Sequence, residues 1–229
     1  MKKPTMKNNY DKDFYRNIAS GSSLSAQIVV PFVCDVLNPT SVLEIGCGVG
    51  TWSQEFVNRG IADVLAVDGP WVDLQSLYID SSKFKAHDLR EPLNIQRRFD
   101  LAVCMEVAEH LPESMANMIV SLLTDHADTV LFAAAVPFQG GTDHINEQPQ
   151  SYWAALFKEK GYEYYDIVRP EIWNNRSVEI WYRQNIIVYS KNKIDLKSKP
   201  ILDVIHPEIL EYYLSNWKGV LRSIRLLTK

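Results

Sequence analysis

The sequence predicts an α/β fold built on a doubly wound, mostly parallel sheet. Short apolar runs rich in Val, Leu, Ile and Ala suit strands that are buried on both faces, and segments with helical periodicity lie between them. Towards the end of this pattern, two strand-like runs follow each other too closely for a crossover helix, which favours antiparallel pairing. A length of 229 residues with 46% hydrophobic residues suits one α/β domain with a sizeable core.

The expected strands and helices alternate along the chain, which indicates right-handed strand–helix–strand units. Apolar residues at helical spacing predict helices over residues 24–36, 115–123 and 153–157. The first helix is expected to bend near Pro31, and the third is bounded by Pro149 and Gly161. The expected strands are Val42–Ile45, Val64–Val67, Leu101–Met105, Val130–Val136, Tyr162–Val168 and Val178–Tyr189, the last two being separated by Arg169–Ser177.

The overall charge and the cysteine content exclude several classes of protein. A formal net charge of −4 gives no general attraction for nucleic acid or anionic membranes. The three cysteines, Cys34, Cys47 and Cys104, make neither a disulfide framework nor a CxxC metal pair. No apolar run approaches the roughly 18–20 residues that span a bilayer. We therefore expect a cytoplasmic protein without a transmembrane segment and without a nucleic-acid partner.

Three regions are expected. Residues 1–40 comprise the first helix and, before it, a segment in which Tyr10, Phe14 and Tyr15 could form a lid. Residues 41–190 form the core. Residues 191–229 form a basic tail with helical periodicity, containing eight Lys or Arg and four Asp or Glu. The tail is either a partly packed, solvated helix or a segment that docks a partner.

A glycine-rich turn is the most informative motif. In residues 42–52, VLEIGCGVGTW, an apolar run leads into Gly46, Gly48 and Gly50 and then into a helix. Glycines allow a tight turn and close approach of a ligand to the main chain. The GxGxG spacing and the carboxylate of Glu44 are ill suited to a pyrophosphate, but they suit a ligand that carries positive charge. Asp68, at the end of the next strand, can accept hydrogen bonds from ribose hydroxyls, and Asp88 could bind an adenine amino group.

Four motifs in order, LEIGCGVGTW, AVDG, HDL and FDLAVCMEVAEHLP, resemble those of the class I S-adenosylmethionine-dependent methyltransferases. They cover about residues 40–112, and the strand order extends the resemblance to about residue 190. The resemblance implies a Rossmann-like sheet of seven strands, whose last two form an antiparallel hairpin, and S-adenosylmethionine as cofactor. It implies cofactor contacts at Glu44, Gly46, Cys47, Gly48, Gly50, Asp68, Asp88, Leu89, Met105 and Glu106.

The segment after the expected strand Val130–Val136 is the candidate acceptor site. Residues 135–153 contain many polar side chains and a Gly140-Gly141 pair, at the strand end where α/β sheets bind ligands. The pattern GGT-x-H-IN-EQ with VRPEIW and WYRQN resembles a bacterial subgroup of class I methyltransferases that is associated with surface-glycan gene clusters. This resemblance implies O-methylation of a sugar or glycan-linked small molecule.

Three residues are candidates for catalysis. Imidazole suits proton acceptance near neutral pH, which favours His144 as general base, with loop shaping as the alternative. Glu147 could orient His144 or place a negative charge near the start of the next helix, and we favour the second. His110 follows the fourth strand and is a structural or a catalytic residue.

A metal ion is not expected. Glu106, Glu109, His110, Asp143 and His144 could in principle assemble a divalent site, but a Mg²⁺ site needs converging carboxylates, and no tight acidic cluster stands in the sequence.

Aromatic and basic residues around the terminal hairpin suit either binding of a sugar or phosphate or packing at a sheet edge. These residues are Arg169, Trp173, Trp181, Arg183 and Gln184.

Two other functions stay open at this point. One is methylation of another small-molecule hydroxyl or amine. The other is a non-catalytic, cofactor-binding scaffold whose basic tail docks a partner.

Overall fold

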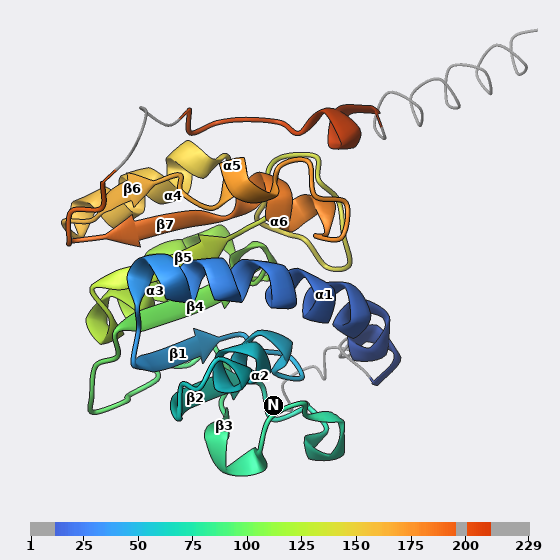
Figure 1. Cartoon of the computed structure of the whole chain (residues 1–229), viewed down its shortest axis with the longest axis vertical. Helices are drawn as coiled ribbons and strands as arrows, with labels where there is room; N and C mark the ends of the chain where they lie inside the picture. Colours follow the sequence, from blue (N-terminus) through green and yellow to red (C-terminus); the bar gives the residue numbers. More distant parts are fainter. Residues whose placement is uncertain (1–11, 196–200, 212–229) are drawn as a thin grey trace, which may run out of the picture.

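The computed structural model describes residues 12–195 and 201–211. Within them, a seven-stranded sheet has the order β3-β2-β1-β4-β5-β7-β6, which confirms the predicted fold class (Figure 1). The pairs within β3 to β5 are parallel, whereas β7 is antiparallel to both β5 and β6. The strands are β1 (Ser41–Ile45), β2 (Asp63–Asp68), β3 (Phe84–Ala86), β4 (Leu101–Met105), β5 (Thr129–Ala133), β6 (Glu163–Tyr165) and β7 (Ile187–Ser190).

Neighbouring residues of each central strand point to opposite faces of the sheet, so apolar side chains project from both faces. Helices cover both of these faces. Val42 of β1 packs in the cluster with α1 (Lys12–Leu37) and α2 (Thr51–Asn58). Leu43 packs in the cluster with α3 (Ala116–His126) and α4 (Gln150–Glu159). Figure 1 shows α1 running across the sheet on the first of these faces. Each face therefore has its own apolar core, and the sheet edge between them is left for ligands.

The predicted terminal strand over Val178–Tyr189 is wrong in its first half. Residues Ile180–Asn185 form a short helix, α6, and only Ile187–Ser190 pair as β7. Another short helix, α5 (Arg169–Ile172), lies in the expected linker. A short apolar run does not distinguish a strand from a buried helix by its period alone. Here the helix is favoured because it turns the polar side chains of Arg183, Gln184 and Asn185, which are themselves buried, towards hydrogen-bonding partners.

Part of the basic tail packs against the domain. The buried guanidinium of Arg169 pairs with Asp166 and donates to the carbonyls of Ile201 and Leu202 at 2.7 and 3.0 Å. Gln184 accepts from the backbone of His206. Arg169 is therefore occupied within the fold, as is the buried Arg183, which pairs with Glu208 at 2.8 Å. This agrees with the packing alternative for the hairpin. Residues 212–229 lie outside the described residues.

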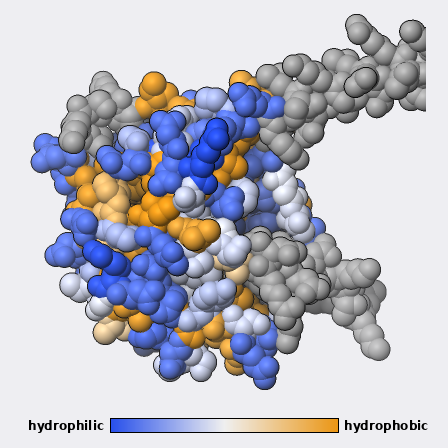
Figure 2. Space-filling view, turned by 45° about the vertical axis from the view of Figure 1, so that its right-hand side comes forward, coloured by the Kyte–Doolittle hydropathy of each residue, from blue (hydrophilic) through white to orange (hydrophobic). Residues whose placement is uncertain are grey.

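One stretch of the described chain, Ala19–Leu37 in α1, is long and apolar enough to cross a membrane by length and composition. Its side chains at Ala26, Val29, Val30 and Val33 are fully buried in the core against the sheet. A core helix passes the same test of length and composition. On the face seen in Figure 2, hydrophobic side chains are interspersed with hydrophilic ones.

Candidate functional site

The glycine-rich turn between β1 and α2 is tied to the end of β2. The backbone N–H groups of Gly46 and Cys47 donate to the carbonyl of Val67 at 2.8 and 3.1 Å. The N–H of Gly48 donates to Oδ2 of Asp68 at 2.6 Å. Two of the predicted motifs, LEIGCGVG and AVDG, are therefore joined by hydrogen bonds at the carboxyl edge of the sheet.

Gly46 is required by both its conformation and its surroundings. Its φ of 76° is a left-handed conformation that glycine adopts at little cost. A Cβ at this position would lie 2.4 Å from Cγ2 of Val107, which is closer than real contacts allow. Val107 belongs to the turn after β4, so the glycine turn and that second turn are in direct contact.

Glu44 supports the glycine turn from behind. Its side chain is 2% exposed, and Oε2 accepts hydrogen bonds from the backbone N–H, at 2.9 Å, and the hydroxyl of Ser53. Burial raises the pKa of Glu44 to about 8, opposed by the two Ser53 hydrogen bonds. Ser53 lies in the first turn of α2, where free N–H groups need acceptors. Glu44 therefore fixes the start of α2 behind the turn.

Asp68 occupies the front of the same turn. Its Oδ1 accepts from the N–H of Gly69 and its Oδ2 from that of Gly48, both at 2.6 Å. Burial raises its pKa to about 6, although both hydrogen bonds favour the ionised form. Cys47 is buried beside it, with its side chain among Ala66 and Ile79, so it presents only backbone to a ligand.

Asp88 and Leu89 lie after β3, next to the end of β2. Both oxygens of Asp88 pair with the guanidinium of Arg90, at 2.8 and 2.6 Å, and Arg90 holds the pKa of this carboxyl below its usual range. Leu89 is buried. The N–H of the neighbouring His87 donates to the carbonyl of Asp68 at 2.7 Å. Asp88 therefore directly follows a residue that is bonded to the end of β2, but a ligand would share its carboxylate with Arg90.

The turn after β4 holds Glu106 in an unusual conformation. Its φ is 55°, and its carboxylate accepts from Gln139 at 2.7 Å and from Asn185 at 2.9 Å. Burial raises the pKa of Glu106. Met105, the last residue of β4, is buried on the same edge. Strained backbone outside glycine persists where the surroundings enforce it, and it is common at functional sites.

The loop between β5 and α4 is a second strained segment, and backbone hydrogen bonds connect it to the turn after β4. The carbonyl of Glu109 accepts the N–H groups of Ile145 and Asn146 at 3.0 and 3.1 Å. Phe138 and Asp143 in this loop also have positive φ, at 71° and 57°. The two segments that follow β4 and β5 are therefore held together by backbone hydrogen bonds.

His144 and Glu147 form a hydrogen-bonded pair in this loop. Nδ1 of His144 lies 3.0 Å from Oε1 of Glu147. The Glu147 carboxylate also accepts from the N–H groups of Phe138 and Gly140, both at 2.7 Å. Of the two roles considered for Glu147, the structure shows the one in which it orients His144, together with the loop itself. Because a carboxylate only accepts, Nδ1 carries the proton and Nε2 has a free lone pair.

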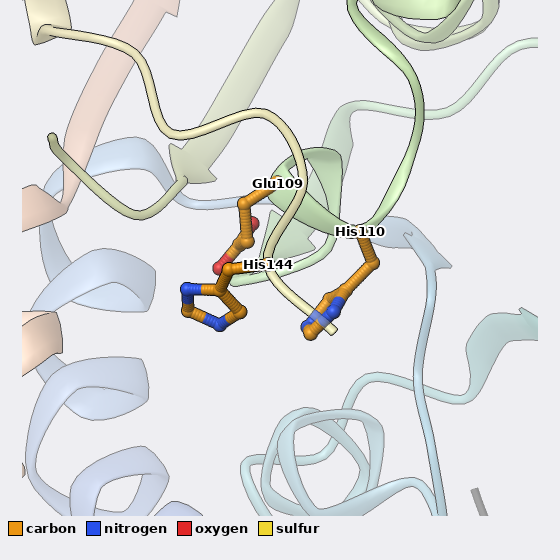
Figure 3. A group of neighbouring side chains, drawn as sticks. All are labelled: Glu109, His110 and His144. Carbon is orange, nitrogen blue, oxygen red and sulfur yellow. The ribbon is translucent and has the colours of Figure 1, made fainter. Parts of the chain in front are cut away.

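His110 lies beside His144, with ring centroids 4.9 Å apart and the planes nearly perpendicular. Burial and the neighbouring His144 lower the pKa of His110 to about 4. Figure 3 shows Glu109, His110 and His144 converging from the turn after β4 and the loop before α4. All three sequence-predicted catalytic candidates, His110, His144 and Glu147, therefore lie in one cluster.

The sequence of this chain is similar to those of known proteins. Residues 29–167, more than half of the chain, match a family described as "Methyltransferase domain". The chain belongs to this methyltransferase family. A relative from Psychrobacter cryohalolentis, a ubiquinone biosynthesis O-methyltransferase, is 30% identical over 137 residues, which are 54% of this chain and 46% of that protein. This methyltransferase spans about half the length of such curated relatives.

Solved structures agree on the fold of the methyltransferase. The sugar N-methyltransferase KedS8 from a Streptoalloteichus species has a TM-score of 0.61 at 13% identity, covering 84% of this chain and 96% of that one. Magnesium protoporphyrin IX methyltransferase from Synechocystis, with bound S-adenosylhomocysteine, has a TM-score of 0.54 at 16% identity, covering 77% and 86%. At these identities the likeness shows the fold alone. Family and fold together make this chain an S-adenosylmethionine-dependent methyltransferase.

The glycine turn of the methyltransferase fits its cofactor. Gly46, Gly48 and Gly50 all take left-handed conformations, which make a tight turn whose backbone can approach a ligand closely. The ionised Asp68 can accept from ribose hydroxyls, and the backbone at Gly48 and Gly50 lies in the same turn. S-adenosylmethionine supplies an activated methyl group on a sulfonium.

Binding of the product S-adenosylhomocysteine should weaken in acid. Ribose hydroxyls bind an ionised carboxylate more strongly than a neutral one. Since the pKa of Asp68 is about 6, affinity should be constant above pH 7 and fall as the pH drops through 6. At pH 5 we expect roughly tenfold weaker binding in calorimetry than at pH 7.5. Asp68→Asn should bind weakly at both pH values, and a wild-type affinity that is equal at both would contradict the assignment.

The sequence analysis missed several residues of this site. Gln139 and Asn185 hold Glu106, but Asn185 lies in a segment that was predicted as a strand. Gly141 was noted only as part of a glycine pair, although a Cβ there would lie 2.3 Å from Nε2 of His144. The expectation of no metal named Glu109, His110 and His144 among the possible ligands, but it rested on the carboxylates that Mg²⁺ requires. It did not weigh a transition-metal ion.

Proposed function

We propose that this methyltransferase transfers the methyl group to a hydroxyl of a sugar or glycan-linked small molecule, with His144 as general base. The observation that supports this most is the His144–Glu147 pair, which leaves Nε2 of an oriented imidazole available in the loop after β5. Val107 connects this region to the cofactor turn, because it packs against Gly46 while its neighbours hold the loop.

The proposed reaction is an in-line displacement. The acceptor oxygen forms the new C–O bond, the electron pair of the broken C–S bond stays on sulfur, and the hydroxyl proton passes to Nε2 of His144. The two linked turns position the acceptor, which is the largest contribution expected for such a reaction. Cytoplasmic location and a role in glycan synthesis stay predictions.

A sugar acceptor is supported by the polar character of the loop and by the likeness to a sugar methyltransferase fold. A phenolic acceptor is the second candidate, because the curated relatives are O-methyltransferases of ubiquinone biosynthesis. The loop presents Phe138, 83% exposed, and Ile145, 64% exposed, which would suit contact with an aromatic ring. Both candidates share the hydroxyl as the methylated group.

The test is transfer of a labelled methyl group to three sets of acceptors: nucleotide sugars, catechols and other phenols, and amino sugars. We expect turnover with a hydroxyl acceptor, preferentially a nucleotide sugar, and loss of turnover in Asp68→Ala. Preference for phenols would move the second candidate to first place. Methylation of amines alone would overturn O-methylation.

A further inference from the structure

We propose that Glu109, His110 and His144 form a binding site for one divalent transition-metal ion beside the cofactor turn. One ligand atom from each of the three side chains lies within 4.8 Å of the other two. Ligands on one ion with bonds of about 2.1 Å lie at most about 4.2 Å apart, so a small contraction would close the site. Two imidazoles and a carboxylate suit Zn²⁺, Mn²⁺, Fe²⁺ or Co²⁺ better than Mg²⁺.

The Glu109 carboxyl group points independently to a missing cation. Its side chain is 0% exposed, and among the described residues neither oxygen has a hydrogen-bond partner. A buried polar group without a partner is costly, and buried carboxylates are normally paired or bind metals. A bound cation would remove this cost.

Both imidazoles are prepared for metal binding. The ring of His110 lies beside that of His144, with ring centroids 4.9 Å apart. His144 donates from Nδ1 to Glu147, which leaves Nε2 for the ion. A carboxylate on the far nitrogen of a metal-binding histidine is the usual arrangement, because it fixes the tautomer and the orientation of the ring.

Gly141 leaves room for the imidazole ring of His144. A Cβ there would lie 2.3 Å from Nε2 and 2.5 Å from Cε1 of that ring, so a side chain at this position would push the ring out of place. The glycine therefore lets the ring keep the orientation in which Nε2 can bind an ion. The backbone hydrogen bonds from Ile145 and Asn146 to Glu109 hold the two halves of the site together.

The ion would bind the acceptor hydroxyl at an open position and lower its pKa, so that its proton passes to solvent water and His144 holds the ion instead of accepting the proton. This role rests on the proposed function, whereas binding of the ion does not. If no ion binds, His144 stays the general base of the proposed function, so the two proposals can fail separately.

The experiment uses the full chain without a histidine tag, stripped with chelator. Titration with Co²⁺, followed by visible absorption and by elemental analysis, should give one ion per chain, displaced by Zn²⁺. Glu109→Gln, His110→Ala and His144→Ala should each weaken binding at least 10–100-fold. His87→Ala, whose ring bonds to the carbonyl of Glu91 outside the cluster, is the control and should bind as wild type.

Gly141→Ala keeps all three ligands and should still weaken Co²⁺ binding. Gly140→Ala is its matched control, because Gly140 also has a positive φ but a Cβ there would meet nothing within 4 Å. Absence of Co²⁺ binding, or binding that the three ligand variants leave unchanged, would overturn the proposal. Thermal unfolding of each variant without metal shows whether it is folded.

Discussion

Turnover of His144→Ala should fall about 10²–10⁴-fold, the range for loss of a general base. The same range is expected if His144 holds a metal ion that activates the acceptor. Affinity for S-adenosylhomocysteine should stay close to wild type, because the cofactor turn is built from β1, β2 and their loops. Single-turnover methyl transfer and calorimetry measure the two quantities. Unchanged turnover would exclude His144 from the reaction.

His110→Ala separates the two roles of His144. If His144 acts alone as a base, loss of the neighbouring ring at 4.9 Å should change turnover only modestly. If the two rings hold an ion, both variants should lose turnover to a similar extent, and added chelator should inhibit the wild type. A preserved His110→Ala rate would therefore support the metal-free reaction.

Gly46→Ala should both destabilise the methyltransferase and abolish binding of S-adenosylhomocysteine. A left-handed conformation costs a residue with a Cβ about 1–2 kcal/mol, and overpacking against Val107 adds about 1–3 kcal/mol. The sum, about 2–5 kcal/mol, corresponds to a fall of roughly 5–20 °C in the melting temperature. The clash with Val107 would also displace the glycine turn that is expected to bind the cofactor.

Gly60→Ala is the matched control for this variant. Gly60 has a φ of 91°, but a Cβ there would meet nothing within 4 Å, so only the conformational cost applies. Combining Gly46→Ala with Val107→Ala should recover part of the lost stability, because it removes the clashing methyl groups. If Gly46→Ala and Gly60→Ala are equally stable, contact with Val107 is not what excludes a side chain at position 46.

The fold could be predicted because its determinants are local. The runs that became β1, β2, β4 and β5 are apolar and short. The helix α3 begins soon after Pro112, and α4 lies between Pro149 and Gly161. Asp68 and the glycines were found for the same reason, since each occupies a fixed place at a strand end. A prediction fails where a short segment fits two structures, as for α6, which was taken for a strand.

The assembly of the acceptor site could not be predicted, because it depends on contacts between distant segments. Glu109 and His144 are brought together by backbone hydrogen bonds that no residue pattern announces. Asn185 reaches Glu106 across 79 positions of the chain. The residue types in the loop indicated a polar site, whereas the role of Glu147 followed only from its distance to His144.

The strand order also has a consequence for synthesis on the ribosome. β6 is made before β7, yet β7 lies between β5 and β6, so β6 has no neighbour in the sheet until β7 has emerged. Arg169 meets its carbonyl partners at Ile201 and Leu202 later still. Chains fold as they emerge, and an unpaired strand edge is prone to aggregation. A nascent chain that stalls before residue 187 therefore exposes the edge of β5. The sheet is complete only when β7 pairs between β5 and β6, which have both been synthesised before it.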